Sequence, residues 1–326
     1  MEDNVFRKEF SLPWLVSSPN GCTVGVFGRN KVTLAYVDEG EWKLTNEVNL
    51  HGVITAAAVA DSGKCVVGTD QKSAMTIQRQ GNTLLQVASC ELEAKVFGAA
   101  IMEVDDRCDV YIMEKNDVLK VPFANVGQQA PEHILGHFGL MTRVLPLPRA
   151  RKILTADRDE KIRCSELDRP FIVNRYYFGH TDAVEFAYST ADEKELVTVG
   201  AEGKLIAWNI EEGTLLCSAS LYNGESGAGG RTDACAARCI GSDGLLIAVA
   251  QEGGSVLEVW LCEKGRLVLS SRHNLGVDDI SGIAFLSNSK LLLTTKSNLL
   301  RSLSIEKEAQ SCTAPPPQPF DRDEIF

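Results

Sequence analysis

Two stretches in the middle of the chain repeat each other at a fixed distance. A Gly-His pair begins at 136 and again at 179, a threonine stands at 155 and at 198, and a lysine at 161 and at 204, so three landmarks share an offset of 43 residues. A period of about 40 to 45 residues is that of one four-stranded blade of a β-propeller. The repeat therefore predicts a ring of blades, an all-β architecture in which each blade packs on its neighbours.

Short apolar or β-branched segments between turn residues continue at similar spacing along the chain. We expect each to be the second strand of a blade, and we expect the Gly-His pair to open a blade's first strand. The segments are Thr23–Phe27, Lys64–Gly68, Asp109–Met113, Lys152–Thr155, Glu195–Val199, Leu245–Ala250 and Lys290–Thr294. They predict a seven-bladed β-propeller of the WD-repeat type, with blades at 12–50, 51–92, 93–133, 134–176, 177–221, 230–272 and 273–306.

The two ends of the chain carry separate expectations. A ring of blades must close on itself, and we expect Val5 to Leu12 to supply the closing strand, so that the propeller spans 1–306. Residues 307–326 are rich in proline and acid and are expected to form a disordered tail. The N-terminus has no apolar run of signal-peptide length, and no stretch approaches the roughly 20 apolar residues that span a bilayer. We therefore expect a protein that is not secreted and has no membrane partner.

The charge balance limits the kinds of partner. A formal net charge of −11 opposes general binding to nucleic acid, because phosphate binding is driven by lysine and arginine. Between Arg143 and Arg175, however, the sequence contains nine basic residues and five acidic ones, so positive charge is concentrated in the predicted fourth blade. Any contact with nucleic acid is expected to be local to that blade.

The sequence shows no recognisable catalytic constellation. Ten cysteines form no zinc or disulfide pattern, the closest pair being Cys235 and Cys239. The glycine cluster Asn223–Gly230 leads into no helical pattern, so we interpret it as a loop between blades and expect no bound cofactor. No serine or cysteine has the surroundings of a nucleophile.

Both copies of the repeat resemble WD repeats, whose blades carry a Gly-His, a turn acid and a closing Trp-Asp. The resemblance implies buried polar networks that join His137 to Asp159 and His180 to Glu202 within their blades. The second copy keeps the closing pair as Trp208-Asn209, whereas the first copy has Ser165 at the tryptophan position.

Strand alternation places Ile162 and Cys164 on one side of the predicted strand and Arg163 on the other. Both faces of a blade pack against neighbours, so Arg163 is expected to be partly enclosed and to need a carboxylate. Two interpretations remain open: an ion pair between blades, with Asp157 or Asp182, or a contact with a partner protein.

The string Leu154-Thr-Ala-Asp-Arg-Asp-Glu-Lys-Ile-Arg163, flanked by Leu135-Gly-His137 and Phe178-Gly-His180, resembles the WD-repeat, non-catalytic subunit of the eukaryotic tRNA (guanine-N7) methyltransferase. The resemblance is specific over roughly residues 134 to 182. It implies that the chain binds and stabilises, as a heterodimer, a catalytic subunit that depends on S-adenosylmethionine. It further implies a location in the nucleus, with the cytoplasm left open as a second location. It also implies that the chain helps to seat tRNA, mainly through the complex, and is not itself an enzyme.

The same resemblance assigns roles to individual residues. The implied partner-facing residues are Arg163, Lys161, Arg158, Thr181 and Asp182. The residues expected to order the loop are Asp157, Asp159 and Glu160. The basic residues considered for contact with the tRNA backbone, with solvation of the surface as the alternative, are Arg143, Arg149, Arg151 and Lys152.

Two other functions remain open at the level of sequence. A general WD-repeat adaptor, such as a substrate receptor of a ubiquitin ligase, would use the same fold for a different partner. An enzyme working in the central channel would need catalytic residues that the sequence does not present.

Overall fold

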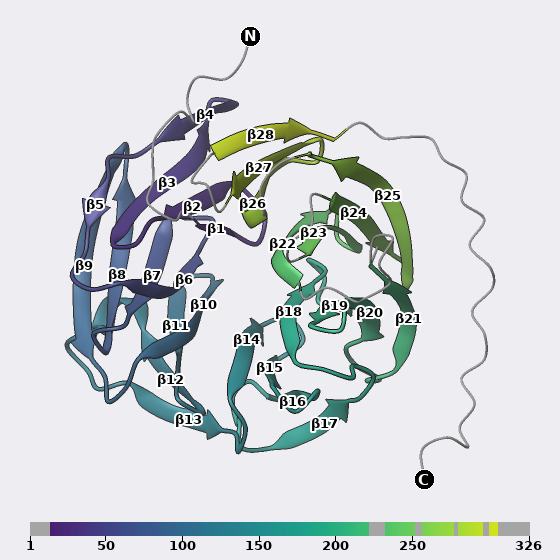
Figure 1. Cartoon of the computed structure of the whole chain (residues 1–326). Helices are drawn as coiled ribbons and strands as arrows, with labels where there is room; N and C mark the ends of the chain where they lie inside the picture. Colours follow the sequence, from purple (N-terminus) through teal and green to yellow (C-terminus); the bar gives the residue numbers. More distant parts are fainter. Residues whose placement is uncertain (1–13, 222–231, 252–255, 277–279, 296–299, 306–326) are drawn as a thin grey trace.

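The computed structural model describes residues 14–221, 232–251, 256–276, 280–295 and 300–305. Seven antiparallel sheets follow one another around a ring, which confirms the seven-bladed propeller (Figure 1). The first strand of each sheet lies toward the middle of the ring, and the later strands lie successively farther out. In the described part of the chain no helix is long and apolar enough to cross a membrane.

Blades 1 to 3 are each formed by strands that follow one another along the chain. Blade 1 contains β1 (Trp14–Ser17), β2 (Thr23–Phe27), β3 (Lys31–Asp38), β4 (Glu41–Leu44) and β5 (Val48–Asn49), which pairs with β3. Blade 2 contains β6 (Ile54–Val59), β7 (Lys64–Thr69), β8 (Ser73–Gln80) and β9 (Thr83–Glu91). Blade 3 contains β10 (Val96–Val104), β11 (Arg107–Glu114), β12 (Asp117–Pro122) and β13 (Glu132–Gly136), with the 3-10 helix η2 (Phe123–Asn125) before β13.

The other four blades complete the ring. Blade 4 contains β14 (Met141–Leu147), β15 (Lys152–Asp157), β16 (Ile162–Glu166) and β17 (Val173–Tyr177). Blade 5 contains β18 (Val184–Ser189), β19 (Glu195–Gly200), β20 (Lys204–Asn209) and β21 (Leu215–Ser220). Blade 6 contains β22 (Thr232–Ile240), β23 (Gly244–Gln251), β24 (Val256–Glu263) and β25 (Arg266–Asn274). The described strands of blade 7 are β26 (Ile280–Ser287), β27 (Lys290–Thr295) and β28 (Leu300–Ser304).

All seven segments that were expected to be second strands are second strands, namely β2, β7, β11, β15, β19, β23 and β27. They are buried almost throughout because a second strand has pairing partners on both edges and a neighbouring blade on each face. The apolar cores lie between blades. One core, for example, joins Leu154 and Ile162 of blade 4 to Leu196 and Trp208 of blade 5.

Three predicted boundaries are wrong, because blades 3, 4 and 6 end at Gly136, Tyr177 and Asn274 and not at 133, 176 and 272. Residues 132 to 136 form a single strand, β13, which pairs with β12 as the outermost strand of blade 3. The first Gly-His pair therefore does not open a strand of blade 4, because Gly136 ends β13 and His137 lies in the loop that leads inward to β14. The second Gly-His pair lies in a loop and also opens no strand. Val5 to Leu12, Asn223–Gly230 and the expected tail 307–326 lie outside the described residues.

Candidate functional site

Blade 4 has two ends, which its register defines. Asp157 lies opposite Met141, and Ile162 lies opposite Tyr177, so the β15–β16 turn (residues 158–161) and the loop after β17 share one end, here called the upper end. Lys152 lies opposite Leu147 at the other, lower end. The upper end brings together five of the residues that were expected to face the partner or to order the loop. They are Arg158, Asp159, Glu160, Thr181 and Asp182, and all are exposed. Lys161, half-buried, completes the turn.

Three of the four basic residues considered for tRNA lie at the lower end. Asp157 lies five positions after Lys152 along β15, which is roughly 17 Å of strand, at about 3.3 Å per residue. Arg151 pairs there with Asp168 at 2.5 Å, and the Lys152 ammonium lies 3.4 Å from the side-chain oxygen of Asn174. Arg149 is exposed at the same end. The structure therefore separates these cations from the upper end of the blade.

Arg143 is in neither group. Its guanidinium lies 4.6 Å from the ring centroid of Phe186, between inner strands β14 and β18, and it donates to the backbone oxygen of Thr142 at 3.0 Å. Burial lowers the pKa of this guanidinium, against the raising effect of Tyr188 and Glu185. A cation placed between two inner strands is not part of the outer surface, so we do not retain Arg143 as a contact for the tRNA backbone.

Blade 5 contains the expected polar network. The His180 Nδ1 donates to the Glu202 carboxylate at 2.6 Å, and its Nε2 lies 2.7 Å from the Thr198 hydroxyl. The Trp208 indole N–H donates to the same hydroxyl at 2.8 Å. Four side chains from two strands, a loop and a turn thus bond to one another, although the second carboxylate oxygen of Glu202 is buried without a hydrogen-bond partner among the described residues. The bonds fix the loop before β18 to the body of its blade.

In blade 4 the expected pairing of His137 with Asp159 is wrong. His137 Nδ1 donates to Asp157 at 3.0 Å, and its Nε2 lies 2.8 Å from the Thr155 hydroxyl. Asp157 stands at the strand position that blade 5 fills with Gly200, where a Cβ would lie 2.5 Å from the His180 ring. The acid that binds the histidine therefore comes from the strand in blade 4 and from the turn in blade 5. The two equivalent histidines are hydrogen-bonded to carboxylates at different positions of the repeat.

Asp157 also orders the turn that follows it. Its carboxylate accepts a hydrogen bond from the backbone N–H of Asp159 at 2.9 Å. Burial raises the pKa of Asp157, but the hydrogen bonds from His137 and from the Asp159 amide outweigh it, so the pKa lies below its ordinary value. The charged form of Asp157 is thus the one that holds both the histidine and the turn.

Arg163 is partly buried, as expected, but it has no carboxylate partner among the described residues, so the ion pair with Asp157 or Asp182 is wrong. Its Nε donates to the Ser165 hydroxyl at 3.2 Å, and its terminal nitrogens donate to the backbone oxygens of Gly136 at 3.0 Å and Pro170 at 3.3 Å. Gly136 belongs to the outermost strand of blade 3. Arg163 therefore joins blade 4 to blade 3 through neutral oxygens.

Sequence reasoning missed a group of exposed apolar side chains at the upper end of blade 4, namely Phe138, Leu140, Tyr176 and Phe178. Phe138 is 107% exposed and Phe178 is 66% exposed. The available signal was the position of aromatic residues beside both Gly-His pairs, in loops, where the alternation of a strand does not bury them.

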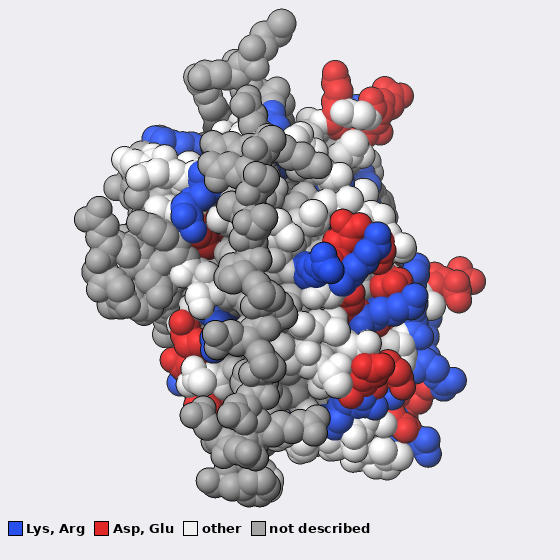
Figure 2. Space-filling model, turned by 90° about the vertical axis from the view of Figure 1, so that its right-hand side faces the viewer, with Lys and Arg blue, Asp and Glu red and all other residues white. Residues whose placement is uncertain are grey.

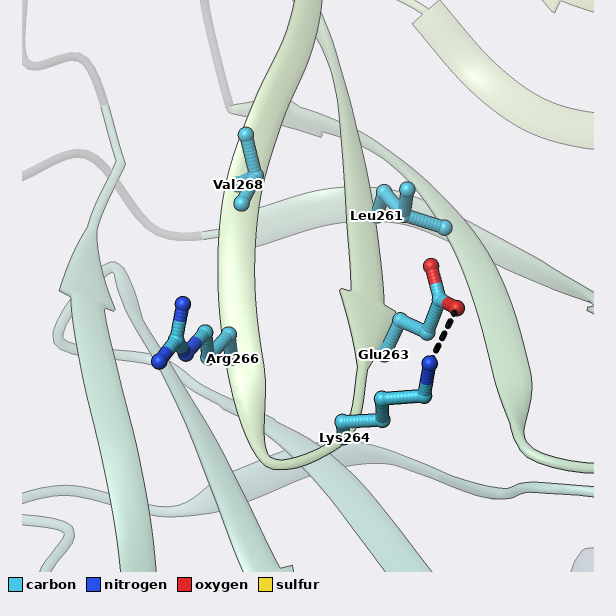
Figure 3. Close-up of a pocket in the computed structure, with 5 residues that line it drawn as sticks. All are labelled: Leu261, Glu263, Lys264, Arg266 and Val268. Carbon is cyan, nitrogen blue, oxygen red and sulfur yellow. Dashed lines mark ion pairs between the residues drawn. The ribbon is translucent and has the colours of Figure 1, made fainter. Parts of the chain in front are cut away.

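Other surfaces offer less. An open pocket at the outer edge of blade 6 is lined by Leu261, Glu263, Lys264, Arg266 and Val268, and its Glu263–Lys264 pair spans 3.7 Å (Figure 3). Basic and acidic side chains are intermingled on the side of the molecule carried by β21 and β25, without a uniform basic patch (Figure 2). No group of three or more histidine, cysteine, aspartate or glutamate side chains in the described part of the chain could hold a metal ion.

Comparison with known proteins confirms the resemblance seen in the repeat. Residues 114–229 match the family model of the tRNA methyltransferase TRM82 WD40 domain. The tRNA (guanine-N(7)-)-methyltransferase non-catalytic subunit TRM82 of Candida glabrata is 28% identical over 50% of this chain and 42% of its own length. The non-catalytic subunit wdr4 of Danio rerio is 26% identical over 65% of this chain and 52% of its own length. The chain thus spans about half the length of these relatives.

Solved structures agree on the fold. The propeller domain of Cps50 (Swd1) from Myceliophteria thermophila superimposes with a TM-score of 0.71, at 9% identity, over 91% of this chain and 96% of its own. The WD40 repeats of RRP9 give a TM-score of 0.70 at 17% identity, over 89% of each chain. At such identities the likeness concerns the fold alone.

Proposed function

We propose that this chain is the non-catalytic WD-repeat subunit of a tRNA (guanine-N7) methyltransferase, which binds and stabilises the catalytic subunit as a heterodimer. The single observation that carries the proposal is that the family match, residues 114–229, covers blade 4, blade 5 and the outer part of blade 3. These are the blades whose loops gather the exposed turn 158–161 and the pair Thr181 and Asp182.

The chemistry assigned to the chain is binding, with methyl transfer supplied by the partner. The relatives that match are named non-catalytic subunits, which supports this division of labour. A catalytic subunit that uses S-adenosylmethionine would hold the cofactor itself, and the propeller would keep that subunit in a productive conformation. The family resemblance favours the nucleus as the location of the complex.

Binding of tRNA is proposed to occur mainly through the complex. The chain has a net charge of −11, so its long-range field repels phosphate. The cations at the lower end of blade 4 are partly neutralised, Arg151 by Asp168 in particular. A catalytic subunit with its own basic surface would therefore supply most of the attraction for tRNA, and the propeller would help to position the tRNA.

The test uses the purified chain with the methyltransferase subunit of the same organism. We expect the two to elute together in gel filtration, the chain alone to transfer no labelled methyl group to tRNA, and the pair to methylate faster than the catalytic subunit alone. Reversing two charges at the upper end, Arg158→Glu with Lys161→Glu, should weaken the complex by at least about tenfold, while Arg149→Glu at the lower end should not. Isolation of the chain with a ubiquitin ligase, and no binding to the methyltransferase subunit, would refute the proposal.

A further inference from the structure

The upper end of blade 4 exposes four large apolar side chains. Phe138 and Leu140 come from the loop between β13 and β14, and Tyr176 and Phe178 come from the end of β17 and the loop that follows. Their exposed fractions are 107% for Phe138, 66% for Phe178 and 45% for both Leu140 and Tyr176. We call these four residues the aromatic cluster. Large exposed apolar side chains gathered at one end of one blade are typical of a binding site.

The loop that carries Phe138 is held firmly from beneath. His137 is buried against Asp157 and Thr155 on one side of Phe138. The Asn116 side-chain amide donates to the Phe138 backbone oxygen at 3.2 Å, and the Arg158 backbone N–H donates to the Leu140 oxygen at 3.0 Å. The phenyl ring is therefore presented to solvent by a backbone fixed at three nearby points, which lowers the entropic cost of docking onto it.

Arg163 contacts the two segments that carry the halves of the cluster. Tyr176 is its cross-strand neighbour in β17 and contacts Phe178, with ring centroids 5.9 Å apart. On the other side Arg163 donates to the backbone oxygen of Gly136, two residues before Phe138. Through its bonds to neutral oxygens, Arg163 fixes the spacing of the two halves and does not itself lie at the outermost surface.

The exposed area of the aromatic cluster is a large part of what a protein–protein interface requires. Aromatic side chains carry about 150 to 250 Å² each, so Phe138, Phe178 and Tyr176 together expose roughly 400 Å². A stable complex buries about 800 Å² on each partner. The cluster would thus supply about half of the required surface, and it lies beside the charged turn that supplies a polar rim.

The charges of that rim are available to a partner. Among the described residues Arg158 and Lys161 have no ion pair, and neither do the turn acids Asp159 and Glu160. In blade 5 the equivalent turn acid, Glu202, is held by His180, whereas in blade 4 Asp157 takes that role and leaves the side chain of Asp159 outside the network. A partner can therefore satisfy both signs of charge around an apolar centre.

We infer that the aromatic cluster is the energetic centre of the interface with the catalytic methyltransferase subunit. Its occupant is a segment of that subunit with two or more aliphatic or aromatic side chains, flanked by carboxylates that face Arg158 and Lys161. This inference rests on the proposed function and adds to it that apolar contacts dominate the affinity, while the charges orient the partner.

The chain offers a matched control. Phe171 is 73% exposed, close to the 66% of Phe178, but it precedes β17 and lies at the lower end of the same blade. Phe138→Ser with Phe178→Ser removes the two most exposed rings of the cluster, and Phe171→Ser removes a similarly exposed ring that the proposed interface does not include. None of the three rings is buried, so all variants should fold.

The experiment measures the affinity of each full-length variant for the purified catalytic subunit by calorimetry, together with its melting temperature. The double variant should lose at least about 100-fold in affinity with its melting temperature unchanged, and Phe171→Ser should stay within about twofold of the wild type. If the double variant melts earlier, Phe138→Ser alone serves as the test, because its ring is fully exposed, and a loss of at least about tenfold is expected.

The outcomes separate the two proposals. A wild-type chain that does not bind the catalytic subunit refutes the proposed function. A wild-type chain that binds, with the double variant within about threefold of it, refutes the aromatic centre and leaves the proposed function standing. Concentration-dependent self-association of the wild type that the double variant abolishes would make a second copy of this chain the occupant and would also overturn the inference.

Discussion

Blades 4 and 5 are two copies of one sequence repeat that solve the same structural problem with different residues. In blade 5 the turn acid Glu202, Thr198 and Trp208 complete the network around His180. In blade 4 the corresponding histidine binds Asp157 of the strand, which also accepts from the backbone of the turn 158–161, so the side chains of that turn are left outside the network. The same loop is therefore fixed in both blades, but in blade 4 its turn remains available for contacts with another molecule.

The two blades also differ at the tryptophan position. Trp208 is buried and its ring meets that of Tyr177 edge to face, with centroids 5.6 Å apart. Its counterpart Ser165 is also buried but small, and Arg163, the counterpart of Ile206, donates to its hydroxyl. A serine at this position leaves room for a guanidinium, which then joins blade 4 to blade 3. The comparison shows that departure from a repeat pattern can accompany a gain of contacts.

Replacing the indole should give the largest effect. Trp208→Ser places in blade 5 the serine that blade 4 has at this position, but without a counterpart of Arg163 to fill the space. It leaves a cavity and removes the indole N–H that donates to Thr198. We expect a loss of about 3 to 5 kcal/mol in the free energy of unfolding, the usual range for removal of a buried tryptophan. Urea denaturation measures it, with Ser165→Ala as the mild control. A loss below about 1 kcal/mol would show that the network does not anchor blade 5.

Removing the guanidinium tests whether Arg163 acts within the propeller or at the partner. Arg163→Leu leaves the backbone oxygens of Gly136 and Pro170 without their charged donor, for which we expect a loss of about 1.5 to 3 kcal/mol. Thermal unfolding without the partner checks this, and Lys161→Leu, in the exposed turn, should change stability by less than about 0.5 kcal/mol. Unchanged stability with loss of the partner would return Arg163 to the interface itself.

A smaller effect is expected for the strand acid of blade 4. Asp157→Asn weakens the bonds to His137 and to the Asp159 amide, which should cost about 1 to 3 kcal/mol at neutral pH. Because the pKa of Asp157 is lower in the folded state, its contribution is complete above the unfolded pKa of about 3.9 and is lost as pH falls through the lower folded value.

The measurement is unfolding free energy against pH for the wild type and for Asp157→Asn. The wild type should lose part of its advantage over the variant as the pH falls below about 4, so the two curves should converge in acid. A constant difference between about pH 7 and about pH 3 would show that the charge of Asp157 does not hold the turn.

The smallest effect concerns the backbone of the turn. Glu160 has a φ of 67°, at the position where blade 5 has Gly203 with a φ of 76°. Left-handed backbone costs a non-glycine residue about 1 to 2 kcal/mol, so Glu160→Gly should be neutral or stabilising by up to about 1 kcal/mol. Chemical denaturation of the isolated chain measures this difference. If the Glu160 side chain contacts the catalytic subunit, the same variant should bind it more weakly. Lower stability of Glu160→Gly would mean that its side chain supports the turn.

The 43-residue repeat, with evenly spaced apolar segments, was enough to predict the propeller, the number of blades and the second strand of every blade. Those features depend on the period of apolar residues, which is local and can be read directly from the chain. The resemblance around residues 154 to 163 also pointed to blade 4 from the order of its residues alone.

What the tertiary structure decided is which side chains meet. His137 takes Asp157 and not Asp159, because a strand position and a turn position compete for one ring nitrogen and the three-dimensional register selects between them. Arg149 and Asp159 are near in sequence but lie at opposite ends of a strand, whereas Gly136 and Tyr176 both contact Arg163 although they are far apart along the chain. Spacing along a chain gives the face of a strand, but contacts between blades depend on how the sheets pack around the ring, which no local pattern encodes.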